Sequence, residues 1–182
     1  MSKKFLLILS MVVIGSLLFA ACAPTEEETA EEAPAYVCQI TDTGGIDDKS
    51  FNETAWNGIL QAEEELGVRT NYLESQEVAD YETNLNAFLE EGCDLIITVG
   101  FLIADATKAA AEANPDQKFS IVDYAYDPIV PNIEAQIFET DEAAFLAGYV
   151  AADVSETGVV GTFGGLPIPT VTIFMDGFVA GV

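Results

Sequence analysis

Residues 41–52 read Thr-Asp-Thr-Gly-Gly-Ile-Asp-Asp-Lys-Ser-Phe-Asn, and they lie between an apolar run, 36–40, and a helical pattern, 51–66. A strand, a glycine loop and the start of a helix form the place where α/β proteins hold small molecules. Gly44 and Gly45 permit positive φ, which lets Asp42 and the amides after it face a ligand. The stretch therefore predicts an α/β fold with a ligand-binding loop after its first strand.

The start of the following helix has its own signal. Ser50 and Glu53 have the Ser-x-x-Glu spacing of a capping box, which predicts that Ser50 caps the helix and that Phe51 and Asn52 lie in its first turn. A phosphate-binding loop is excluded, because Asp48 stands where that motif needs glycine before the lysine. An EF-hand loop is excluded as well, because its alternating oxygen ligands and terminal glutamate are missing.

The N-terminal residues predict export and a lipid anchor. Lys3 and Lys4 precede an apolar run, 5–21, which is typical of a signal peptide over residues 1–21. Ala20 and Ala21 before Cys22 resemble the lipobox of bacterial lipoproteins, in which the cysteine carries the lipid. An uncleaved membrane anchor is the alternative, although the run is short for a span of about 20 residues. The acidic, proline-containing segment 22–35 is expected to be a disordered tether.

Charge and composition exclude several classes of function. The chain has 31 Asp and Glu against six Lys and Arg, a formal charge of −25, so nucleic acid is not an expected partner. The absence of histidine removes the common Ser-His and Cys-His catalytic sites and the commonest zinc ligand. We therefore expect no metal and no cofactor at the binding site.

Strand and helix patterns alternate from Tyr36 onward, which predicts a doubly wound parallel sheet. The expected strands are 36–40, 68–73, 94–99, 119–122, 133–138 and 159–163. The expected helices are 51–66, one from Asp80 to Gly92, an alanine-rich helix after Gly100 that stops near Asn114, one over 142–153 and one from about Val171. Alanine and glycine in 142–153 predict close helix packing. Cys38 and Cys93 are interpreted as two buried thiols, although a disulfide between neighbouring strands is permitted outside the cytoplasm.

The stretch 41–52 resembles the N-terminal signature of the basic membrane protein family, the PnrA-like substrate-binding lipoproteins of ABC transporters. Further segments resemble the family in the same order, and together with the first stretch they cover residues 36–182. These segments are Asp94 to Phe101, Val122-Asp123, Phe145 to Tyr149, and Gly164 to Pro169 continuing to Gly177 through Gly181.

The resemblance implies a type I periplasmic-binding-protein fold, in which two α/β lobes close on a ligand that is commonly a purine nucleoside. The first lobe would be residues 36–138, and residues 139–182 would begin an incomplete second lobe, because family members are roughly twice this long. It further implies that Phe51 stacks on the base and that Asp123 binds the ribose hydroxyls. The remaining implied ligand contacts are Asp42, Ser50, Asn52, Gly100, Phe101, Gly164 and Gly165.

Three classes of function are compatible with these residues. The family implies a non-enzymatic binding lipoprotein at the outer face of the cell membrane that hands a solute to permease subunits. A sensory lipoprotein would bind the same ligand and report it to a receptor. An extracellular nucleosidase using Asp42, Asp47, Asp48 or Asp123 is chemically conceivable, and release of free base would identify it. Fold similarity alone does not choose among the three.

Overall fold

The computed structural model describes residues 33–182. The predicted signal peptide, Cys22 and residues 22–32 of the predicted tether lie outside the described residues. Pro34–Val182 forms one unit. It contains five strands and five helices within the described part of the chain.

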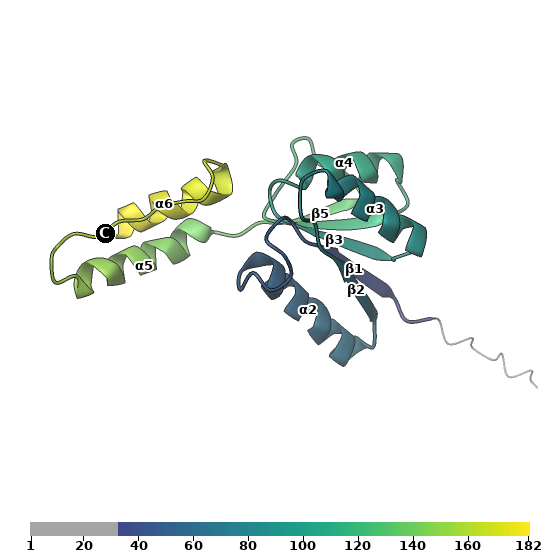
Figure 1. The fold of residues 1–182 in the computed structure, drawn as a ribbon, viewed down its shortest axis with the longest axis horizontal. Helices are drawn as coiled ribbons and strands as arrows, with labels where there is room; N and C mark the ends of the chain where they lie inside the picture. The colour runs from purple at the N-terminus through teal and green to yellow at the C-terminus, as the bar shows by residue number, and fades with distance from the viewer. Residues whose placement is uncertain (1–32) are drawn as a thin grey trace, which may run out of the picture. The chain divides into compact units, whose positions relative to one another are not determined.

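The five strands form one parallel sheet (Figure 1). They are β1 (Tyr36–Ile40), β2 (Arg69–Leu73), β3 (Leu95–Val99), β4 (Lys118–Val122) and β5 (Ile133–Gln136), in the spatial order β2-β1-β3-β4-β5. The chain runs outward from β1 to β2 and then returns to the other side of β1 as β3. The predicted doubly wound sheet is therefore confirmed, with its topological switch point between β1 and β3.

Helices cover both faces of this sheet, as buried parallel strands require. In Figure 1, α3 (Asp80–Glu91) and α4 (Ala104–Ala113) lie on one face, and α2 (Phe51–Leu66) lies on the other. The main core lies under α3 and α4. It combines alternate strand residues with the buried faces of the two helices, and includes Ile40, Ile96, Phe119 and Ile121 from the strands and Tyr81, Leu85 and Phe88 from α3.

Cys38 and Cys93 form a disulfide within this core, so the expectation of two free thiols is wrong. Both residues are buried, and their Cα atoms lie 6.1 Å apart. Cys38 lies on the face of β1 that is covered by α3. The end of α3 then brings Cys93 above it, since the Cys93 amide donates to the Phe88 carbonyl. The crossover through α3 thus brings Cys93 close to Cys38. The sequence patterns of the individual strands do not reveal this distance.

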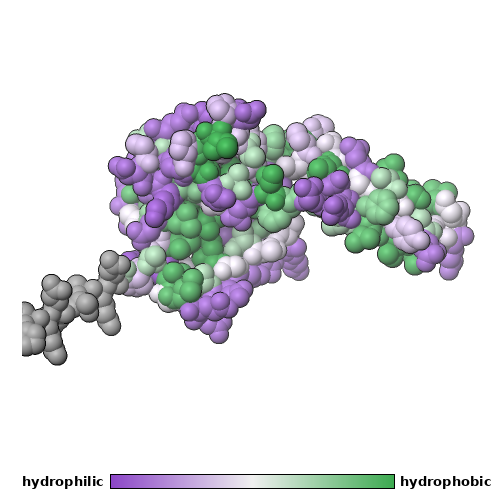
Figure 2. All heavy atoms as spheres, turned by 180° about the vertical axis from the view of Figure 1, so that it is seen from behind, coloured by the Kyte–Doolittle hydropathy of each residue, from purple (hydrophilic) through white to green (hydrophobic). Residues whose placement is uncertain are grey.

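The last helices, α5 (Thr140–Val154) and α6 (Pro169–Gly181), pack closely along each other. A Cβ atom on Gly148 would overlap the Phe178 carbonyl, and one on Gly181 would overlap the Phe145 carbonyl. The backbones therefore approach each other directly, and the close packing predicted for this segment is confirmed. Apolar side chains remain exposed on the pair (Figure 2), among them Leu146, Tyr149, Val154 and Val179.

The strand predicted over 159–163 is wrong. These residues connect α5 to α6 without forming a strand. A β-strand needs a neighbour to accept and donate its backbone hydrogen bonds, and within the described residues the paired strands all belong to the one sheet formed by 36–136. The valine-rich pattern alone does not supply that partner.

Candidate functional site

The predicted site residues gather at one edge of the sheet. Asp42 follows β1, Gly100 follows β3 and Asp123 follows β4, and parallel strands bring their carboxyl ends to the same edge. The contacts there are close. A Cβ atom on Gly100 would lie 3.2 Å from the Asp42 Cβ, and the Gly100 amide donates to the Val122 carbonyl at 3.0 Å. The edge beside the switch point thus carries these three residues.

Asp48, and not Ser50, caps the N-terminus of α2. One Asp48 carboxylate oxygen accepts the amides of Ser50 at 2.8 Å and Glu53 at 3.1 Å, and the other accepts the Asn52 amide at 3.1 Å. Ser50 makes no side-chain cap bond, so the predicted capping box is wrong. Lys49 has φ 55°, and this left-handed residue folds Asp48 back over the helix start. The Asp48 carboxylate thereby takes the amide that the Ser50 hydroxyl was expected to accept.

The surroundings of Asp48 favour its charged form. Burial alone would raise the pKa of Asp48, but the amides of Glu53, Asn52 and Ser50 and the Asn52 side chain donate to the carboxylate, and the pKa is lowered from 3.8. Hydrogen bonds to an ionised carboxylate stabilise that form. Asp48 is therefore an anion at neutral pH, hydrogen-bonded to the amides of Ser50, Asn52 and Glu53 at the start of α2.

Asn52 lies beneath the loop and is almost fully buried, with 1% of its surface exposed. Its side-chain NH2 group donates to Asp42 at 2.8 Å and to Asp48 at 3.0 Å. The same Asp42 oxygen accepts the Gly44 amide at 2.9 Å. Asn52 therefore joins the carboxylates at the two ends of the loop.

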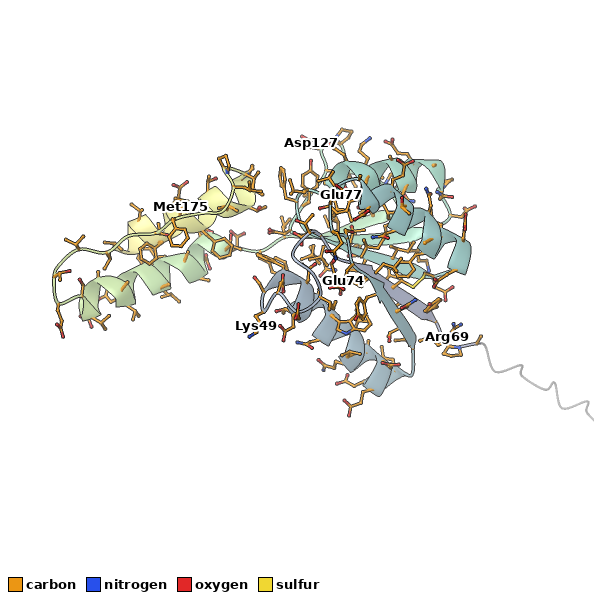
Figure 3. The ribbon with its side chains drawn as sticks, viewed as in Figure 1. Lys49, Arg69, Glu74, Glu77, Asp127 and Met175 are labelled. Carbon is orange, nitrogen blue, oxygen red and sulfur yellow. A yellow bond between two sulfur atoms is a disulfide. The ribbon has the colours of Figure 1, made fainter. Side chains whose placement is uncertain are left out.

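Glu74 holds the outer part of the loop. Its carboxylate accepts the Ile46 amide at 2.8 Å. Figure 3 shows Lys49 at the start of α2, pointing away from the molecule. Three carboxylates, from Asp42, Asp48 and Glu74, thus accept amides of the stretch 44–53, in the way that phosphate oxygens do in phosphate-binding loops.

A cavity of about 280 Å³ opens beside Phe51 and Asp123. Its other lining residues come from the segment 162–175, and they are Thr162, Phe163, Gly164, Gly165, Thr170, Val171, Phe174 and Met175. The rings of Phe51 and Phe174 meet edge to face, with centroids 6.5 Å apart. Phe51 keeps 36% of its surface exposed, which fits a side chain that faces a cavity.

Asp123 has an unusual backbone and environment. Its φ of 70° is rare for a residue with a side chain, and its amide donates to the Gln136 carbonyl at 2.7 Å. Burial raises the pKa of its carboxyl group. Backbone conformations of this kind are often found at binding sites. Asp123 therefore combines a cavity position with a partly desolvated carboxyl group.

A cluster of three aromatic residues lies next to Asp123. The ring of Tyr124 packs edge to face against Phe101 at 5.2 Å and against Tyr126 at 4.9 Å. The Tyr126 hydroxyl donates to the Ala104 carbonyl at 2.8 Å, and burial raises its pKa. Phe101 is thereby fixed at the sheet edge, although it does not line the cavity.

Only some of the predicted ligand-binding residues therefore line the cavity. Phe51, Asp123, Gly164 and Gly165 line it, whereas Asp42, Ser50, Asn52, Gly100 and Phe101 lie along the same sheet edge outside its lining. The other lining residues were not predicted, and they are Thr162, Phe163, Thr170, Val171, Phe174 and Met175. In α6, residues 170, 171, 174 and 175 have the helical spacing of one face, and this periodicity was the available signal.

The described residues offer neither a metal site nor a membrane-spanning helix. Residues 33–182 contain no group of three or more Cys, Asp or Glu side chains arranged to hold a metal ion. Among the helices of the same residues, none is both long enough and apolar enough to span a membrane.

Comparisons with known proteins agree on one family. The family model described as ABC transporter substrate-binding protein PnrA-like matches residues 35–182. Basic membrane protein A of Borreliella burgdorferi is 38% identical over 96% of this chain and 51% of its own length. The ABC transporter nucleoside-binding protein BmpA of Lactococcus lactis is 33% identical over 98% of this chain and 53% of its own length.

A solved structure supports the fold. An ABC transporter solute-binding protein from Aeropyrum pernix is similar with a TM-score of 0.74 and 34% identity, over 81% of this chain and 42% of that protein. The chain therefore spans about half the length of the curated relatives it matches.

Proposed function

The chain belongs to the PnrA-like family of ABC transporter substrate-binding proteins, and from that membership we propose that the complete protein binds a purine nucleoside between two α/β lobes and delivers it to a permease. The observation that carries the proposal is that an aromatic ring, Phe51, and a carboxyl group, Asp123, line one cavity. These are the two chemistries that a nucleoside needs.

Each group suits one part of the ligand. A flat, apolar base packs well against an aromatic face, and Phe51 offers its ring with Phe174 nearby. An ionised carboxylate accepts hydrogen bonds from two neighbouring ribose hydroxyls, which is the role proposed for Asp123. The Lactococcus relative is named as a nucleoside-binding protein. We assign further contacts to Gly164 and Gly165, which line the same cavity, and to Asp42, Ser50, Gly100 and Phe101 along the sheet edge.

Residues 36–138 would form the first lobe and residues 139–182 the beginning of the second. The exposed apolar side chains of α5 and α6 support this division, because a two-lobed protein would cover them with the remainder of the second lobe. The cleft between the lobes would then close on the solute, and the closed form would dock on the permease.

Cys22 would carry the anchor that keeps the protein at the outer face of the membrane. Members of the family are substrate-binding proteins of membrane transporters, and Cys22 follows a signal-like sequence. Two acyl chains on one cysteine bind a membrane far more firmly than a single chain. The tether 22–35 would let the folded part reach the permease.

Calorimetric titration of the complete, signal-free protein with a panel of nucleosides tests the proposal. We expect saturable binding of at least one purine nucleoside, with no free base released during the titration. Binding confined to an unrelated class of solute would contradict the ligand assignment. Release of free base would indicate a nucleosidase instead of a binding protein.

A further inference from the structure

Asp48 directs all of its hydrogen bonds at the start of α2. Its carboxylate accepts four donors, which are the amides of Ser50, Asn52 and Glu53 and the side-chain NH2 of Asn52. Asp48 does not line the cavity. Its contacts are therefore directed at the residues that present the site.

The four bonds divide between the two carboxylate oxygens. Oδ1 accepts the amides of Ser50 and Glu53, while Oδ2 accepts both donors of Asn52. The first pair closes the end of α2. The second pair fixes Asn52, which is buried and also donates a hydrogen bond from its side-chain NH2 group to Asp42.

These hydrogen bonds also constrain two neighbouring residues, Phe51 and Asp42. Phe51 stands between Ser50 and Asn52, whose amides both donate to Asp48, so the backbone on either side of its ring is held. Asp42 has one oxygen held by Asn52 and Gly44, and its other oxygen would lie 2.9 Å from a Cβ atom on Gly100. Asn52 is thus the link between Asp48 and Asp42.

We propose that Asp48 is a positioning residue of the binding site, and that its carboxylate and the buried Asn52 amide form a clamp that directs the Phe51 ring and the Asp42 carboxylate toward the solute. This inference rests on the proposed function and deepens it. Both protons of the Asn52 amide are committed to Asp42 and Asp48. Its side-chain oxygen is buried and has no hydrogen-bond partner among the described residues, so the positioning role stands beside the direct ligand contact implied by the family resemblance.

Three variants of the complete protein separate positioning from helix capping. Asp48→Ala removes all four acceptor bonds. Asp48→Asn keeps one carbonyl oxygen, which can serve only one pair of donors, and we expect it to cap Ser50 and Glu53 and to lose Asn52. Asp47→Asn is the matched control, because Asp47 is the neighbouring carboxylate and is exposed.

Three measurements are made on each variant. Hydrogen exchange reports the amides of Ser50, Asn52 and Glu53, NMR scalar couplings report the χ1 rotamers of Phe51, and calorimetry reports guanosine binding. For Asp48→Ala we expect fast exchange, several Phe51 rotamers and affinity about tenfold weaker, which is the scale of a lost charged hydrogen bond. For Asp48→Asn we expect an apo melting temperature near that of the unchanged protein but weakened affinity. The control should match the unchanged protein in all three.

The outcomes keep the two proposals apart. Absence of binding of guanosine and of every other purine nucleoside by the unchanged protein would count against the proposed function, and the Phe51 rotamers of Asp48→Ala would then decide on the clamp alone. A single Phe51 rotamer in Asp48→Ala, or an Asp48→Asn variant with full affinity, would overturn the positioning role. If the affinity of the Asp48 variants falls only in proportion to their melting temperature, Asp48 acts as a helix cap and not as a positioning residue.

Discussion

Cys38 in β1 and Cys93 before β3 are joined by a disulfide inside the core that lies under α3 and α4. The bond spans 55 residues of sequence and encloses α2, β2 and α3. It therefore ties β1 to the end of α3, across the segment that forms α2, the edge strand β2 and α3.

Reduction of this disulfide should destabilise the folded protein by about 4 kcal/mol, as the chain entropy of a loop of this length indicates. We would compare urea unfolding of the Cys22→Ser protein with that of its Cys38→Ala/Cys93→Ala counterpart. Thiol labelling of the denatured Cys22→Ser protein should detect no free thiol before reduction and two afterwards. Two reactive thiols in the unreduced protein would contradict the disulfide.

Phe51→Ala should weaken purine nucleoside binding roughly ten- to a hundredfold, because a stacked aromatic contributes about 1–3 kcal/mol per base. The apo melting temperature should change little, since Phe51 is already 36% exposed. Phe138→Ala is the control, as Phe138 is an exposed phenylalanine outside the cavity. A strongly destabilised apo protein would mean that Phe51 is a core residue.

Asp123→Asn should raise stability and lower affinity at neutral pH. Burial raises the pKa of Asp123 above 3.8, so the folded state binds the proton more tightly than the unfolded state does. Stability therefore falls as pH rises from the ordinary value through the raised one, and this contribution is absent in the asparagine variant. Melting curves of both proteins from pH 3 to pH 7 should diverge with rising pH.

Nucleoside affinity of the same Asp123→Asn variant should fall about tenfold, because the charge-assisted hydrogen bonds to the ribose are lost. Parallel melting curves across the whole pH range would show that the pKa of Asp123 is not raised in the folded protein. Unchanged affinity would remove Asp123 from the site.

Gly148→Ala and Gly181→Ala should each separate α5 from α6, at a cost of about 1–3 kcal/mol for overpacking. The added methyl group would meet the carbonyl of Phe178 in one case and of Phe145 in the other. Gly161→Ala is the control, because a Cβ atom there has open space. Thermolysin is the suitable probe, since the chain has no Lys or Arg after Lys118 for trypsin to cleave. Equal cleavage rates in all three variants would contradict the close packing.

Cys22→Ser should release the protein from the membrane fraction or leave it with an uncleaved leader. This prediction rests on the sequence before Cys22, in which two lysines are followed by an apolar run and then by small residues. Cell fractionation with mass spectrometry of the N-terminus measures this outcome. A shortened, unlipidated Cys22→Ser product that stays in the membrane would show that the anchor lies elsewhere.

The regular elements of residues 36–136 could be predicted because each leaves a local pattern. The apolar run 36–40 and the helical pattern 51–66 match β1 and α2, and the expected strand 68–73 begins one residue later, at Arg69. Asp80 begins α3, although it accepts the amides of Gln76 and Glu77 and does not cap the helix. Helix α4 begins later than Gly100, at Ala104. Periodicity thus locates elements well and their ends less well.

The errors concern properties that no local pattern contains. Ser50 and Glu53 have capping-box spacing, but the turn at Lys49 brings Asp48 to the same amides. The disulfide depends on a crossover of 55 residues. Phe174 meets Phe51 across more than 120 residues of sequence. The disulfide and the contact between Phe51 and Phe174 depend on chain geometry over long separations, whereas the Asp48 cap depends on the left-handed turn at Lys49.

The carboxylates that accept loop amides have a consequence for the solutes that the protein admits. Amides at a glycine loop and a helix start are the groups that hold phosphate elsewhere, and here Asp42, Asp48 and Glu74 already occupy several of them with negative charge. A phosphorylated solute would meet both occupied donors and repulsion, while its uncharged parent would meet neither. On the proposed function, the loop would select against charge, and a nucleotide would have to lose its phosphate groups before its nucleoside could be bound.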